Sequence, residues 1–147
     1  MSRFEKGSSW VAPAVVEFML AHPDVPVGCN NSGSTGVVVG AVLESMAAAG
    51  LPVSRLSLMN GGEFKQACGG LLVAVSEGRF ERPARDQADL DRAVADATER
   101  PLMGGFAWAQ RNVTVPISPL NAVTVARALL PVDAVADVVV LSGSLMR

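Results

Sequence analysis

A glycine-rich segment between a predicted strand and a predicted helix is the part of this sequence best suited to chemistry. Residues 28–35 read Gly-x-x-x-x-Gly-Ser-Thr, close to the P-loop pattern in which backbone N–H groups and a helix N-terminus hold phosphate. The P-loop lysine would stand at position 34, where this chain has serine, so the cation that contacts the β- and γ-phosphates is missing. ATP hydrolysis is therefore not expected. A turn that needs glycine for its geometry, or a small phosphate-ligand site over residues 28–36, remain the two alternatives.

The candidate nucleophiles and metal ligands have simpler structural interpretations. Cys29 precedes a predicted helix, whose dipole would lower the pKa of its thiol, but the only histidine, His22, lies beyond the preceding strand. Cys68 has helical spacing with apolar neighbours and is predicted to lie in the core. The acidic residues Asp86, Asp89, Asp91, Asp96 and Glu99 have Arg92 among them and Arg82, Arg85 and Arg100 beside them, which favours a solvated helix face over a metal site.

Trp108 and Arg111 are a second pair of interest because an aromatic ring and a guanidinium group suit contact with a phosphate backbone. The structural alternative is a half-buried tryptophan beside an exposed arginine. Sequence spacing does not separate these two interpretations.

Hydrophobic periodicity predicts the elements that must position these residues. Helices are expected over residues 10–21, 37–49, 63–76, 86–100 and 118–130, with Ser9 as the first N-cap and Pro119 in the last helix's first turn. Strands are expected over residues 25–28, 53–59, 106–110 and 112–115, with a short extended piece at 79–81 and a turn at 60–62. This alternation predicts an α/β fold.

Composition sets further limits on function. The 147 residues are 50% hydrophobic and 18% charged, which predicts one domain with a substantial core. The net charge of -2 provides no overall basic excess for independent DNA binding. Two cysteines and one histidine are too few for a Cys/His zinc site. Without a secretory signal or a membrane-length apolar run, we expect a cytoplasmic protein with reduced thiols and no membrane partner.

Several short segments carry a family resemblance through their order. They are residues 6–13 (KGSSWVAP), 66–69 (QACG), 90–94 (LDRAV), 100–102 (RPL), 107–108 (AW) and 117–122 (ISPLNA). Over residues 6–130 the chain resembles the C-terminal nuclease domain of tailed-bacteriophage terminase large subunits, particularly those of actinobacterial phages. We therefore expect a terminase nuclease-like domain over residues 1–130, followed by a tail, residues 131–147, that the resemblance does not place.

The resemblance implies a ribonuclease-H-like mixed sheet flanked by helices, with its first strand missing from this chain. In that family the domain follows a motor ATPase and cuts concatemeric viral DNA during packaging. Acidic side chains there hold two Mg²⁺ or Mn²⁺ ions, which activate water and stabilise the leaving oxygen. The family's acidic positions correspond here to Asn30, Gly105 and Pro116, none of which supplies a carboxylate.

The resemblance therefore predicts a protein of viral DNA packaging with an impaired or inactive nuclease site. No cofactor is expected, and Mg²⁺ or Mn²⁺ would be needed only if nuclease activity survives. Two alternatives are a non-catalytic module that contacts packaging or capsid proteins, and the phosphate-ligand binder described above. The expected partners are double-stranded DNA, a terminase or a portal protein. The residues predicted to contact DNA or a partner are Asn30, Asn31, Ser34, Thr35, Trp108 and Arg111.

Overall fold

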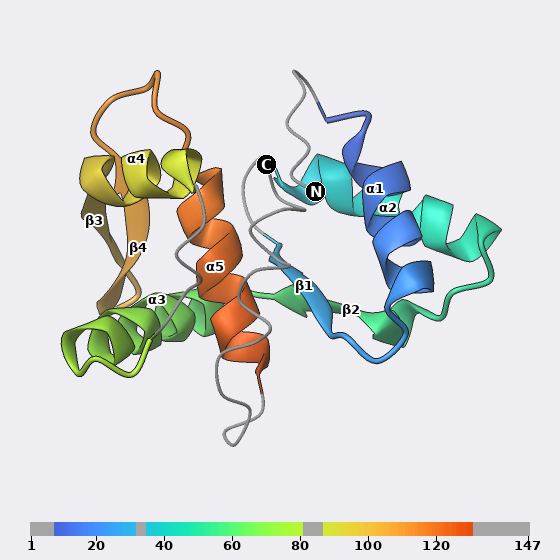
Figure 1. Ribbon diagram of the computed structural model, residues 1–147, viewed down its shortest axis with the longest axis horizontal. Coiled ribbons are helices and arrows are strands. Elements are labelled where there is room, and N and C mark those ends of the chain that lie inside the picture. The colour runs from blue at the N-terminus through green and yellow to red at the C-terminus, as the bar shows by residue number, and fades with distance from the viewer. Residues whose placement is uncertain (1–7, 32–34, 81–86, 131–147) are drawn as a thin grey trace.

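The computed structural model describes residues 8–31, 35–80 and 87–130, and it confirms the α/β class. Figure 1 shows α1 and α2 on one side of the β1–β2 pair, and the remaining helices with the β3–β4 hairpin on the other. In chain order the elements are α1 (Val11–Ala21), β1 (Val27–Asn30), α2 (Thr35–Ala48), the 3₁₀ turn η1 (Val53–Arg55), β2 (Leu56–Met59), α3 (Gly61–Ser76), α4 (Ala88–Asp96), β3 (Ala97–Leu102), β4 (Gly105–Gln110) and α5 (Ser118–Leu129).

The described strands form two separate two-stranded sheets, where the family resemblance predicts a single mixed sheet. Strands β1 and β2 are parallel, in register from Val27 opposite Leu56 to Asn30 opposite Met59, and α2 lies in the connection between them. Strands β3 and β4 are antiparallel. Their two-residue turn places both Met103 and Gly104 at positive φ (49° and 80°), as a type I′ hairpin requires.

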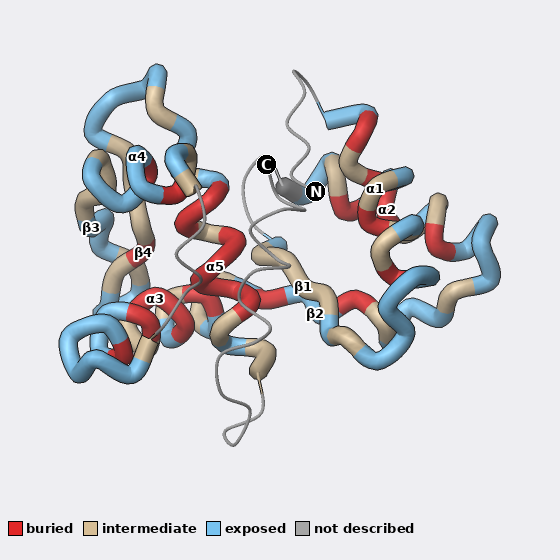
Figure 2. The backbone as a smooth tube through the Cα atoms, viewed as in Figure 1, coloured by how far each residue is buried: buried red, intermediate tan, exposed pale blue. Residues whose placement is uncertain are grey.

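Helix α5 joins the two halves of the structure because it contacts α3, α4 and β1. Much of α5 is buried, as Figure 2 shows, and Val125 and Val123 belong to two different core clusters. A third cluster fills the space between α1, α2 and β2, where Met19 and Met46 are almost fully buried. Burial of these apolar side chains supplies the main stabilising free energy of the fold.

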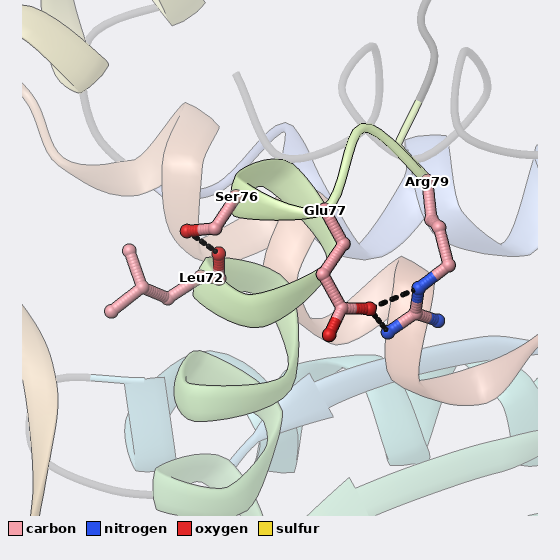
Figure 3. Close-up of polar contacts among 4 residues, drawn as sticks. All are labelled: Leu72, Ser76, Glu77 and Arg79. Atoms are coloured by element: carbon pink, nitrogen blue, oxygen red, sulfur yellow. Dashed lines mark hydrogen bonds and ion pairs between the residues drawn. The ribbon is translucent and has the colours of Figure 1, made fainter.

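Helix α3 begins and ends with well-defined local interactions. Asn60 accepts the backbone N–H of Glu63, and Glu63 accepts that of Asn60, which completes a capping box. The prediction of a turn at residues 60–62 is therefore wrong, since Asn60 caps the helix and the two following glycines form its first turn. At the other end, the Ser76 hydroxyl donates to the Leu72 carbonyl, and Glu77 pairs with Arg79 (Figure 3).

The predicted helix over residues 86–100 ends four residues early, at Asp96. Residues 97–102 instead form β3, which pairs along its whole length with β4. Pro101 opposes a helix that continues through Arg100, because the residue before proline is disfavoured in the α conformation. Residues 97–102 therefore pair in the hairpin although their sequence pattern is helical.

Other elements also differ from their predicted boundaries. Residues 112–115 form a turn where a strand was predicted, because Asn112 accepts hydrogen bonds from the backbone and hydroxyl of Thr114. Ser9 is not the N-cap of α1, since Trp10 takes that position and its side chain makes no capping hydrogen bond. The first strand begins two residues later than predicted, and the predicted strand over 53–59 begins with η1. Of the extended piece at 79–81, residue 81 lies outside the described residues, as does the tail 131–147.

Candidate functional site

The carboxyl ends of the parallel strands meet the start of α3. Asn30 ends β1 opposite Met59, and the N–H of Asn31 continues the pairing by donating to the Met59 carbonyl at 2.8 Å. Asn60, which follows Met59 in the sequence, caps α3. Two predicted contact residues, Asn30 and Asn31, therefore lie at the edge where ligands commonly bind in α/β proteins.

The glycine-rich segment is described only at its ends. Residues 32–34, which include the predicted contact Ser34, lie outside the described residues, and Thr35 is placed as the first residue of α2. Gly28 lies within β1, where a Cβ atom would be 2.6 Å from Leu129 Cδ1 and 3.0 Å from the Ser57 carbonyl oxygen. Close packing of β1 against α5 and β2 therefore accounts for this glycine, in place of the turn geometry that the sequence suggested.

Gly105 lies beside a lysine that sequence reasoning did not single out. A Cβ atom at position 105 would be 2.6 Å from Lys65 Cγ and 2.7 Å from Lys65 Cδ. The Lys65 ammonium group donates to the Met103 carbonyl at 3.0 Å, and Met103 Sδ would lie 3.7 Å from a Cβ on Gly61. The hairpin turn thus lies against the first turn of α3, and a cationic side chain fills the space that an acidic residue at position 105 would need.

Pro116, the third position where the resemblance places an acidic ligand, lies on a different segment from Asn30 and Gly105. It is exposed and lies two residues before α5, whereas the other end of α5, at Leu129, packs against Gly28 of β1. A helix of twelve residues is about 18 Å long, so most of the length of α5 separates Pro116 from the contact between Leu129 and Gly28. Of the three positions where the resemblance places acidic ligands, Asn30 and Gly105 lie near the start of α3, whereas Pro116 lies just before α5.

Trp108 lies on β4, and its side chain is hydrogen-bonded to α5. Its indole N–H donates to the hydroxyl of Thr124 at 2.9 Å, and that fully buried hydroxyl donates in turn to the Leu120 carbonyl at 2.7 Å. The ring also packs edge-on against Phe106, with centroids 5.0 Å apart. The polar atom of Trp108 is therefore used inside the protein, which fits the half-buried alternative.

Arg111 begins an exposed loop that a carboxylate fixes in place. Asp96 Oδ2, at the end of α4, accepts the backbone N–H groups of Arg111 and Asn112 at 2.9 and 3.0 Å. The Arg111 residue itself is exposed. Asp96 belongs to the acidic cluster seen in the sequence, but no local pattern shows that its partner lies fifteen residues later.

Neither thiol is set up as a nucleophile. Burial raises the pKa of Cys29, which is the opposite of the lowering expected from a helix dipole. Burial also raises the pKa of Cys68, while a backbone hydrogen bond at Trp108 and the charge of Arg100 oppose that rise. Cys68 is completely buried, which confirms its predicted place in the core.

The described residues include no group of three or more histidine, cysteine, aspartate or glutamate side chains arranged to hold a metal ion. None of the helices that the structure describes is both long and apolar enough to cross a membrane. Comparisons with protein-family models, curated proteins and solved structures found no match to this chain. The geometry around α3 and the order of the sequence segments are therefore the basis for a functional proposal.

Proposed function

We propose that the protein is a terminase nuclease-like module that acts in viral DNA packaging by binding and does not cut DNA. The observation that carries this proposal is the packing of the Lys65 side chain against Gly105. Where the resemblance places an acidic metal ligand, the chain has no side chain, and methylene groups of a lysine occupy the space. The same lysine places its ammonium group on the hairpin turn, where it donates to the Met103 carbonyl.

Electrostatics explains why this arrangement opposes two-metal chemistry. A divalent cation near the Lys65 ammonium group would be repelled by it, and solvent weakens this repulsion because the ammonium group is exposed. Carboxylates normally offset such repulsion and the cost of dehydrating the ion. Asn30 offers at most a neutral amide oxygen, and Pro116 offers no side-chain ligand. The residues at these positions do not fit Mg²⁺ or Mn²⁺, so no catalytic step is assigned to them.

The ribonuclease-H-like fold is part of the same proposal. In a ribonuclease-H-like scaffold, β1 and β2 would be two strands of the mixed sheet, with α2 as their crossover helix and Asn30 at the site edge. Their parallel pairing and the polar residues at their carboxyl ends support this assignment. Its place of action would be the host-cell cytoplasm, where packaging takes place in that family.

Protein partners suit the described surface better than DNA alone. Trp108 directs its only side-chain hydrogen-bond donor inward to Thr124, and the chain has a net charge of -2. Arg111 remains exposed on a loop that Asp96 holds in one conformation, so it can bind a partner at a low cost in conformational entropy. We assign Arg111 as the contact residue for a terminase or portal protein.

Plasmid nicking tests the catalytic part of the proposal. With Mg²⁺ or Mn²⁺, the protein should convert no more supercoiled plasmid to the nicked form than a metal-free control. Metal-dependent cutting that is abolished by Asn30→Ala would overturn the proposal. Retention of cutting in Asn30→Ala would point to a contaminating nuclease, and the assay would then be repeated with protein from a nuclease-deficient strain.

Binding to purified portal and full-length terminase from an actinobacterial tailed phage tests the remaining part. We expect measurable binding by biolayer interferometry, weakened at least about threefold by Arg111→Glu. Arg79→Glu is the matched control, because Arg79 is exposed but pairs with Glu77 on its own chain. Absence of binding to both proteins would refute the packaging role, and equal effects of the two variants would refute the assignment of Arg111.

A further inference from the structure

We draw no further inference here: the strongest candidate, the exposed aliphatic patch of Leu72, Val73 and Val75 at the carboxyl end of α3, is an unpartnered apolar face among the described residues, and nothing in the structure shows what covers it.

Discussion

Replacement of Thr124 by valine tests directly whether Trp108 serves the fold or a ligand. Valine has nearly the same shape as threonine, so the change removes the hydroxyl that accepts the Trp108 indole N–H without leaving a cavity. A donor left unpaired in a partly buried site costs about 1–3 kcal/mol. The added methyl group recovers part of this free energy, so we expect the free energy of unfolding to fall by about 1–2 kcal/mol.

The measurement is urea unfolding followed by circular dichroism, extended to a double-mutant cycle with Trp108→Phe. The double variant has neither donor nor acceptor, so its loss of stability should be smaller than the sum of the two single losses by about 1 kcal/mol. Thr98→Val, on β3, is the control and should change stability by less than about 0.5 kcal/mol. If the losses add to within about 0.3 kcal/mol, the hydrogen bond does not couple the two residues and the structural interpretation of Trp108 fails.

Substitutions at two glycines and at Asn60, together with the chemistry of the two thiols, provide further tests. Gly28→Ala should lower the free energy of unfolding by about 1–3 kcal/mol, because its Cβ would meet Leu129 and a backbone carbonyl. Gly40→Ala, in an open helical position, should raise it by about 0.5–1 kcal/mol, and equal urea midpoints for the two variants would contradict this packing. Asn60→Ala should cost about 1 kcal/mol through loss of the α3 cap, so an unchanged thermal midpoint would argue against the cap. Burial raises the pKa of the thiols of Cys29 and Cys68 above the ordinary value for cysteine. Their contribution to the free energy of unfolding is therefore complete below that ordinary pKa and is lost as the pH rises through the raised pKa. Both thiols should react slowly with a disulfide reagent until urea unfolds the chain, and rapid reaction of the folded protein would show that burial does not suppress thiolate formation.

Part of the candidate site was predictable because its signals are local. The apolar spacing in α1 and α5 and the proline at the start of α5 gave these helices to within a residue or two. Gly50 and Gly78, which lie two residues after α2 and α3, both have positive φ, which glycine adopts at little cost. The place of Asn30 at the carboxyl end of a strand also followed from sequence, although that strand is shifted by two residues.

The sequence by itself determined the α/β class, most of the helices and the burial of Cys68, because apolar periodicity and helix caps act between residues only a few positions apart. Tertiary structure alone decided that residues 97–102 leave their helix to pair with β4, that Lys65 fills the space beside Gly105, and that Trp108 bonds to Thr124. The hairpin pairs residues up to 13 positions apart, Trp108 and Thr124 are 16 positions apart, and Lys65 and Gly105 are 40 positions apart. The free energies of these contacts arise only when the chain has brought the elements together.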